Sequence, residues 1–308
     1  MRNLFRLLTL CLVLLAVAAG PVLAAPEPAV PDQGKLAVAD ALVKQDQQKN
    51  VQAKGCIALE SILGNAVVDF KAEAAQEPQP VAKVTGKITL TTLADNAKRV
   101  VPLKLYVLQE EKEVWCYTQR QDGSWVRTVT KNEDFGKDSV LTREKALEKL
   151  QTVTRVKDDG TFVTYRIVPA KKGVTEQAIP QTVPKLGTLT PEQRRTIADA
   201  IDGQAFTVTI EKKGLLVSCE ADAGKCLQTL LTVVMDQAAK EQKLSDLQKG
   251  FANAILQTVQ LRFQADLAYK KRKAPKVPKA ALNAPVVKQE QLGDEVITRP
   301  DKSPRQAA

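Results

Sequence analysis

The sequence predicts an α+β fold built around one large, curved antiparallel sheet. Segments in which apolar and polar residues alternate recur through most of the chain, and each is typical of a strand with one buried face. Several are joined by glycine-containing turns that are typical of hairpins. The last alternating segment, residues 259–269, exceeds the length of an ordinary strand, which favours a large and strongly curved sheet.

The first half of the domain is expected to begin with a helix and to continue as strands. Apolar residues at helical spacing predict a helix over residues 36–51. Apolar runs and alternation then predict four strands, at residues 56–62, 66–71, 84–90 and 99–108. Residues 114–120 and 125–130 are expected to pair as a hairpin because Asp122-Gly123 lies between them.

The second half of the domain is expected to mix helices with strands. Helical spacing of apolar residues predicts helices at residues 143–153, 227–239 and 244–256. Another helix is expected to begin at Thr190 and stop at Gly203, because Thr190-Pro191-Glu192-Gln193 is a capping box with proline at the first helical position. The remaining strands are predicted at residues 161–168, 206–210, 215–219 and 259–269.

The N-terminus has the three parts of a cleavable secretory signal. Arg2 and Arg6 supply positive charge, residues 7–19 are apolar, and the Val22-x-Ala24 pattern predicts cleavage before Ala25. The apolar run is too short to cross a bilayer comfortably, so no retained anchor is expected. The mature protein is therefore expected to be exported and soluble, in the periplasm or outside the cell.

The chain is expected to contain one domain with two loose ends. No lipid anchor is expected, because Leu10 precedes Cys11 where lipid attachment requires a small residue. The predicted organisation is a signal peptide at residues 1–24, a flexible leader at 25–35, one domain at 36–284 and a disordered tail at 285–308.

Four cysteines remain in the mature chain, namely Cys56, Cys116, Cys219 and Cys226. They allow three pairings, and an oxidising destination favours disulfides. Cys219 and Cys226 are close in the sequence and flank Ala223-Gly224, so they are expected to close a small loop at a strand-to-helix junction. Cys56 would then pair with Cys116. The alternative for either pair is two free, buried thiols that pack as small apolar groups.

The composition excludes several common classes of enzyme. The chain contains no histidine, which removes the Ser-His-Asp and Cys-His nucleophile pairs and the usual zinc ligands. No serine is followed three residues later by lysine, so a Ser-x-x-Lys nucleophile is missing as well. We therefore expect no catalytic residue, no cofactor and no metal. Chemistry based only on carboxylates stays open as an alternative.

The chain is basic, with a formal net charge of +10. Its lysines are spread along the sequence and do not form a nucleic-acid footprint, so nucleic acid is not an expected partner. Residues 270–279 form a basic, proline-containing segment after the last strand. One interpretation is attraction to an anionic membrane surface, and the alternative is a solvated linker.

Three short stretches carry a family resemblance. They are residues 105–107 followed by 114–117 and 123–126, with their aromatic residues; residues 214–217 after Lys212-Lys213; and the proline-containing residues 277–284. These stretches resemble the aromatic hairpin, a central hairpin and the closing segment of the LolA/LppX-type half-barrel superfamily of periplasmic lipoprotein and lipid carriers. The resemblance covers residues 36–284.

The resemblance implies a half-barrel whose concave face is covered by helices, with a cavity for an apolar ligand between them. The candidate cavity residues are Leu103, Leu105, Phe206, Val208, Leu261 and Phe263. Ordinary core packing is the alternative for each of them. Trp115 and Trp125 also have two interpretations, as a binding rim or as a cross-strand pair that stabilises the hairpin.

The functional hypothesis is an exported, non-enzymatic binding or carrier protein for an apolar ligand in the cell envelope. The ligand class is a lipid, an acyl chain or a lipidated protein. The main alternative is a structural or adhesive envelope protein whose core is filled and binds no ligand. A carboxylate enzyme is a third possibility.

Overall fold

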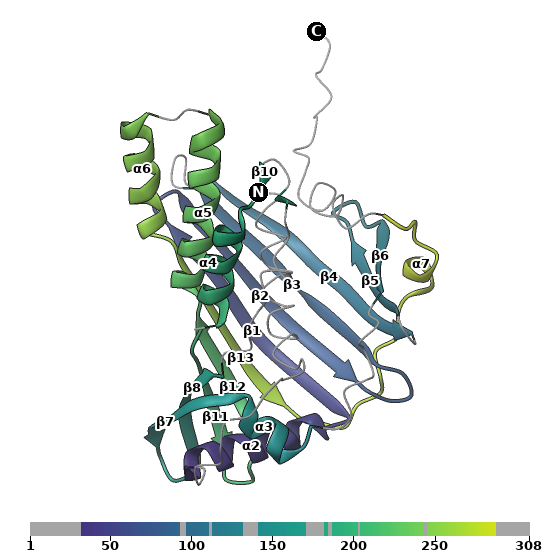
Figure 1. Cartoon of the computed structure of the whole chain (residues 1–308). Helices are drawn as coiled ribbons and strands as arrows, with labels where there is room; N and C mark the ends of the chain where they lie inside the picture. The colour runs from purple at the N-terminus through teal and green to yellow at the C-terminus, as the bar shows by residue number, and fades with distance from the viewer. Residues whose placement is uncertain are drawn as a thin grey trace.

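The computed structural model describes residues 32–92, 97–110, 113–131, 141–170, 182–183, 187–202, 204–242 and 245–287. Its central feature is one 11-stranded antiparallel sheet, which curves without closing into a barrel (Figure 1). Most of the helices lie on one face of this sheet, and a short helix after the last strand packs on the other. The predicted fold class, a curved α+β half-barrel, is confirmed.

The strands of the sheet lie in the order β6-β5-β4-β3-β2-β1-β13-β12-β11-β8-β7. Their bounds are β1 Asn50–Ser61, β2 Gly64–Ala75, β3 Val81–Thr92, β4 Lys98–Glu110, β5 Glu113–Gln119, β6 Trp125–Lys131, β7 Leu150–Asp158, β8 Phe162–Pro169, β11 Phe206–Glu211, β12 Leu216–Asp222 and β13 Gln260–Ala268. A separate two-stranded sheet is formed by β9 (Thr182–Val183) and β10 (Gly187–Thr188). Because β1 pairs with β13, the two open edges of the large sheet are the consecutive strands β6 and β7.

The strand predictions are confirmed in position but not in length. The first four strands have 12 or 13 residues, several more than predicted. The last strand, β13, has 9 residues and is shorter than predicted. At its start, the backbone N–H of Val259 donates to the carbonyl of Leu256 at the end of a helix, so Val259 closes that helix and lies outside the strand.

The two faces of the sheet have different characters. Ile57, Val68, Ile88 and Val101 are direct neighbours in the register and lie on one face, which we call the inner face. All four are buried. Side chains at the alternate positions lie on the opposite face, which we call the outer face.

The first two helices differ in length from the predictions. Helix α2 (Gln33–Asp46) begins earlier than predicted, because the Asp32 side chain accepts a hydrogen bond from the N–H of Gly34 at 2.8 Å and caps it. Residues 33–35 are therefore helical, whereas a flexible leader was predicted to extend to residue 35. Helix α3 (Arg143–Glu148) ends before β7, where a longer helix was predicted. Its continuation is rich in β-branched residues, which favour a strand.

The later helices follow their predicted start signals. Helix α4 (Pro191–Asp202) has the predicted capping box: Thr190 N–H donates to Gln193 at 2.8 Å, and Gln193 N–H donates to Thr190 at 3.2 Å. Its predicted stop, Gly203, lies outside the described residues. Helix α5 (Gly224–Gln242) is followed by α6 (Asp246–Gln257), which has a capping box of its own, and α7 is Lys279–Leu282.

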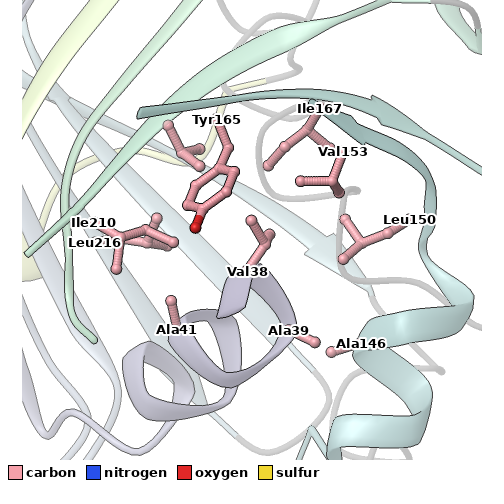
Figure 2. Close-up of a cluster of buried hydrophobic side chains, with 11 residues drawn as sticks. Val38, Ala39, Ala41, Ala146, Leu150, Val153, Tyr165, Ile167, Ile210 and Leu216 are labelled. Carbon is pink, nitrogen blue, oxygen red and sulfur yellow. The ribbon is translucent and has the colours of Figure 1, made fainter. Parts of the chain in front are cut away.

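One core lies where α2 and α3 cover the inner face of β7, β8, β11 and β12 (Figure 2). Val38 on α2 and Ile167 on β8 are fully buried at its centre. Tyr165 lies beside them, and Ala146 brings α3 into the same cluster. The apolar side of α2 is therefore buried against the sheet, although α2 precedes the first strand in the sequence.

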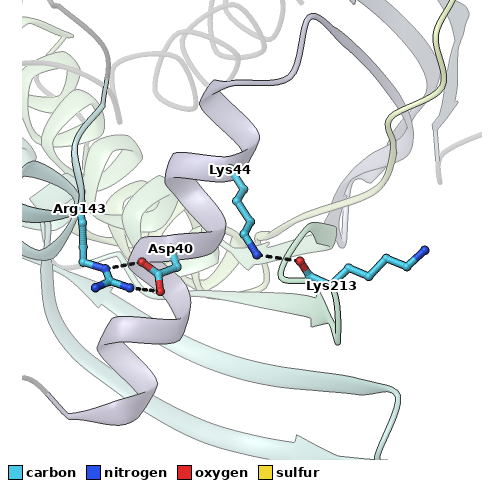
Figure 3. Close-up of polar contacts among 4 residues, drawn as sticks. All are labelled: Asp40, Lys44, Arg143 and Lys213. Atoms are coloured by element: carbon cyan, nitrogen blue, oxygen red, sulfur yellow. Dashed lines mark hydrogen bonds and ion pairs between the residues drawn. The ribbon is translucent and has the colours of Figure 1, made fainter.

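Two polar contacts hold α2 in this position (Figure 3). The carboxylate of Asp40 accepts two hydrogen bonds from the guanidinium of Arg143 on α3. The ammonium of Lys44 donates to the carbonyl oxygen of Lys213, in the turn between β11 and β12, at 2.8 Å. The first contact ties α2 to α3 and the second ties α2 to the sheet.

A second core lies under α5, nearer the middle of the sheet. Leu227 of α5 packs among inner-face residues of β1, β2, β3, β4 and β13, with Leu231 at the margin of the cluster. Helix α4 packs on α5 through Ile197, Ala198 and Val233. The predicted helical cover of the inner face is therefore provided by α2 with α3 at one place and by α5 at another (Figure 1).

The chain after β13 packs against the outer face. Ala281 and Ala284 are buried there with Tyr106, Tyr117 and Trp125. Pro285 and Val287 then exchange backbone hydrogen bonds with Arg127 on the open edge of β6, at 3.1 and 2.9 Å. The disordered tail was predicted to begin at residue 285, but residues 285–287 are held against the sheet. The rest of the predicted tail lies outside the described residues.

Two glycines allow neighbouring strands to approach each other closely around Phe70. A Cβ atom on Gly86 would lie 2.0 Å from the carbonyl oxygen of Asp69, and a Cβ on Gly55 would lie 2.3 Å from that of Gln264. Such distances are far below van der Waals contact, and the clashing atoms belong to the backbone. Both positions therefore require glycine for steric reasons.

We predict that Gly86→Ala lowers the free energy of unfolding by about 1–3 kcal/mol, the usual cost of overpacking. The matched control is Gly250→Ala in α6, where an added Cβ would meet nothing within 4 Å. That control should raise stability by up to about 1 kcal/mol, because alanine favours a helix interior. Urea unfolding of the two variants measures both effects. Equal stability of the two variants would contradict the prediction.

The contact between Asp40 and Arg143 predicts a pH-dependent contribution to stability. Hydrogen bonding to Arg143 holds the pKa of Asp40 below its usual value. Its contribution is therefore complete above the unfolded pKa, about 3.9, and is lost as the pH falls through the lower folded pKa. Because both side chains are partly exposed, Asp40→Asn should cost only about 0.5–1 kcal/mol at pH 7. The difference from the unchanged protein should vanish near about pH 2. Asp199→Asn on α4, an exposed position, is the control and should be neutral at both pH values.

Candidate apolar ligand site

All six candidate cavity residues lie on the inner face of the sheet. Leu103 and Leu105 are on β4, Leu261 and Phe263 on β13, and Phe206 and Val208 on β11. The register joins them to the same face, because Phe263 is opposite Ile57 and Ala221, and Ala221 is opposite Phe206. They do not form one group, however. The four residues of β4 and β13 belong to the cluster under α5, and the two of β11 belong to the cluster under α2.

Burial separates the six candidates into two sets. Leu103, Val208 and Leu261 are 6%, 3% and 6% exposed, and they pack as ordinary core. Leu105, Phe206 and Phe263 are half-buried and lie at the margins of the two clusters. Only the second set retains surface that another molecule can contact.

The inner face continues beyond these clusters as two apolar register rows. We call these eight residues the inner floor: Ala53, Ala72, Val84 and Leu105 in one row, and Val51, Ala74, Ala82 and Val107 in the next. Ala74 is exposed and the other seven are half-buried. Only Val84 and Leu105 touch one of the buried clusters, at its margin. The floor is thus an apolar surface that the four described cores leave partly uncovered.

Most of the inner floor was missed from the sequence because the predicted strands were too short. Ala53, Ala72, Ala74 and Ala82 lie just beyond the predicted strand ends, although each continues the alternation of its strand. Val51 was predicted to end the first helix, which in fact ends at Asp46, and it lies in β1. Alanine has a low preference for strands, so its alternation is a weak signal. Extending the alternation past each predicted end would have found these residues.

A pair of aromatic rings marks the border between the inner floor and the core under α5. The rings of Phe70 and Phe263 are stacked, with centroids 6.3 Å apart and an interplanar angle of 19°. Phe70 lies over Gly55, where a Cβ atom would be only 2.7 Å from its ring. The missing side chain at Gly55 therefore leaves the space that the Phe70 ring occupies beside Phe263 of β13.

The chemistry available at the inner floor is apolar contact. None of its eight residues carries a titratable group, a hydroxyl or an amide. The rows continue into β5 with Thr118, which is buried, and Cys116, whose pKa is raised by burial. Within the described residues, no group of acidic and cysteine side chains is placed to hold a metal ion.

The predicted disulfides are wrong, because all four cysteines are free. Cys56 and Cys116 cannot meet, since β2, β3 and β4 separate their strands by about 19 Å, and a disulfide requires Cα atoms within about 7 Å. Cys56 also lies on the outer face and Cys116 on the inner face. Cys219 lies within β12, which continues to Asp222 before the chain turns into α5 and reaches Cys226. The two cysteines thus flank a strand-to-helix junction, as expected, but their thiols are not joined.

Neither interpretation of the two tryptophans is correct. Trp115 and Trp125 are on the outer face, so they do not form a rim of the inner face, and they are not opposite each other, because their register partners are Val129 and Gln119. Trp125 packs against Tyr106, with ring centroids 5.8 Å apart. The guanidinium of Arg127 lies over the Trp115 ring, 4.9 Å from its centroid.

Comparisons with known proteins concern the fold. No family model and no curated protein matches the chain. Among solved structures, the chain is similar to LprF from Mycobacterium bovis, with 14% identity, a TM-score of 0.34, and 82% of this chain and 99% of that chain covered. It is also similar to a DUF1329 family protein from Desulfovibrio piger, with 15% identity, a TM-score of 0.23 and coverages of 62% and 79%.

The class of the protein follows from its own sheet. The strand order and register describe an open, curved α+β half-barrel with helices on its inner face, the architecture that the resemblance to the LolA/LppX-type superfamily implied. Within the described residues, no helix combines the length and apolar character needed to cross a bilayer.

We predict that a thiol assay on unfolded, non-reduced protein finds Cys56, Cys116, Cys219 and Cys226 free. In the folded protein at pH 8, Cys219 should react very slowly, because burial raises its pKa to about 11 and only about one thiol in a thousand is then ionised. Mass mapping of alkylated peptides measures both, with reduced protein as the control. A cross-linked peptide containing Cys219 and Cys226 would contradict the prediction.

Proposed function

We propose that the protein is an exported, non-enzymatic binding or carrier protein in the cell envelope, which holds an apolar ligand on the inner face of its half-barrel. The ligand class is a lipid, an acyl chain or a lipidated protein. The observation that carries this proposal is the inner floor, eight neighbouring apolar residues of which none is fully buried.

The physical reason is the cost of leaving such a surface in water. Burial of apolar area contributes about 25 cal/mol per Å², and each buried methylene group contributes about 0.8 kcal/mol. An acyl chain bound along the two register rows would therefore be stabilised by a free energy of several times RT. Four of the eight floor residues are alanines, so the floor leaves more room above the sheet than rows of leucine or phenylalanine would.

The absence of catalytic groups supports binding over catalysis. The floor contains no acid, base or nucleophile, and the complete chain contains no histidine. A carboxylate enzyme would need paired acidic groups beside the bound substrate. The acidic residues of β1 to β4 that the structure describes lie at outer-face positions or strand ends, such as Asp69 and Glu73.

A filled structural domain is the alternative, and burial of Leu103, Val208 and Leu261 favours it for part of the inner face. Leu261→Lys would place a charge in the core under α5, so we expect it to unfold the domain, whether or not a ligand binds. A useful test must therefore use a residue of the inner floor.

We predict that Val107→Lys leaves the fold intact and lowers the affinity for a fluorescent fatty acid by about tenfold or more, about 1.4 kcal/mol. Val107 is half-buried on the floor, where a lysine can extend its ammonium to water while its charge opposes an apolar ligand. Val100→Lys is the matched control, since Val100 is on the same strand but on the outer face and is 54% exposed. That control should keep both fold and affinity.

The measurement is fluorescence titration of delipidated protein, with circular dichroism to check the fold. Mass spectrometry of organic extracts should also recover lipid that co-purifies with the unchanged protein. Absence of fatty-acid binding together with absence of co-purified lipid would overturn the carrier proposal and favour the filled scaffold.

A further inference from the structure

The basic segment after β13 is bound to the outer face of the sheet. Arg272 forms an ion pair with Glu73 of β2 at 3.0 Å, and Ala274 and Val277 pack against the outer-face cluster that also buries Ala281. We call residues 269–278 the strap. Because it is anchored at both ends, by β13 and by α7, its charged side chains are held in place along the sheet.

The strap and the first residue of α7 present only positive charge. Their basic residues are Lys270, Lys271, Arg272, Lys273, Lys276 and Lys279, all of them exposed. No acidic residue occurs between Asp266 and residue 287. Of the six basic groups, Arg272 is the one with an ion-pair partner among the described residues.

The sheet beside the strap adds further lysines to the same surface. Lys54 of β1 and Lys71 of β2 are directly opposite in the register, and Lys104 of β4 lies in the same row across Thr85. Like charges directly opposite each other destabilise a sheet, so this arrangement opposes folding. Lys83 of β3 lies in the next row, between Glu73 of β2 and Tyr106 of β4.

The acidic groups nearby offset only part of this positive charge. Asp69 is paired with Lys87 at 3.5 Å and Glu73 with Arg272, so each acid meets a base of its own. Asp266 is opposite Lys54 in the register, but the two side chains form no ion pair. The strap and Lys54, Lys71, Lys83 and Lys104 therefore form one strongly positive area, which we call the basic outer surface.

We infer that the basic outer surface docks the protein on an anionic lipid bilayer. Its charges spread over four strands and the strap, so they form a two-dimensional array, as do the headgroups of an anionic bilayer. Proteins that bind single-stranded nucleic acid usually offer aromatic side chains on which bases stack. On this face Tyr106, Tyr117 and Trp125 are buried, and the guanidinium of Arg127 lies over the half-buried Trp115 ring. The inference concerns the opposite face from the inner floor and goes beyond ligand binding.

The test is binding of the purified protein to phosphatidylcholine vesicles with and without phosphatidylglycerol, measured by co-sedimentation. We expect binding only to vesicles that contain phosphatidylglycerol, with release at high salt. The double variant Lys271→Gln with Lys273→Gln should bind about thirtyfold more weakly, since each basic residue near a charged membrane adds about 1 kcal/mol.

The matched control removes the same charge elsewhere. Lys157 on the β7 edge and Lys225 in the first turn of α5 are exposed and lie away from the strap, so Lys157→Gln with Lys225→Gln should change binding by less than about threefold. Equal losses in both double variants, or no binding to phosphatidylglycerol at low salt, would overturn the inference. Binding to soluble heparin without binding to vesicles would also overturn it and would assign the surface to an anionic polymer.

The same variants separate this inference from the proposed function. The Lys271→Gln, Lys273→Gln protein should keep its affinity for the fluorescent fatty acid, because the inner floor is unchanged. Vesicle binding by a protein that takes up no fatty acid would support the basic outer surface and would overturn only the carrier proposal.

Discussion

Pairing of the first strand with the last is the interaction on which the rest of the structure depends. Nine register pairs, from Gln52↔Ala268 to Glu60↔Gln260, join β1 to β13. Without them the chain would form two separate sheets, one from β1 to β6 and one from β7 to β13. The pairing also places the open edges at β6 and β7. Residues 285–287 cover the edge of β6. On β7, two register irregularities and exposed charged residues oppose pairing of that edge with another chain.

The same pairing decides where the inner face is covered. Helix α2 leads into β1 and α6 leads into β13, so the helical segments enter the sheet at its centre and pack from there. The cluster under α2 extends toward β7, and the cluster under α5 extends toward β4. Between and beyond them the helices that the structure describes leave the inner floor half-buried. Alternation along β1 to β4 places the floor residues on the inner face, and the strand order places the covering helices elsewhere on that face. The partial exposure of the floor is thus a consequence of strand order.

Features that depend on neighbouring residues could be predicted, and features that depend on strand order could not. The hairpin at Asp122-Gly123 and the capping box at Thr190 follow from local chemistry, and both are present. The predicted disulfide between Cys56 and Cys116 was wrong because the sequence does not show how many strands lie between two cysteines in the sheet. Helix α3 was extended too far because Leu150 fits a helical spacing as well as it fits the first position of β7. The strap was open to interpretation as a solvated linker because, among its five basic residues, its two apolar contacts with the sheet, Ala274 and Val277, are a weak sequence signal.

The sheet separates two kinds of surface that would interfere with each other on one face. A lysine beside an apolar ligand loses hydration, and an apolar residue among lysines gains nothing from anionic headgroups. Alternation along β1 to β4 resolves this conflict within single strands: Ala53 and Lys54 are consecutive, as are Leu105 and Lys104, yet their side chains lie on opposite faces. A shift of one residue in the register would exchange the two surfaces. The close contacts at Gly55 and Gly86 oppose such a shift, because only glycine fits where the backbones meet. The glycines that permit close strand approach therefore also keep the apolar and basic surfaces apart.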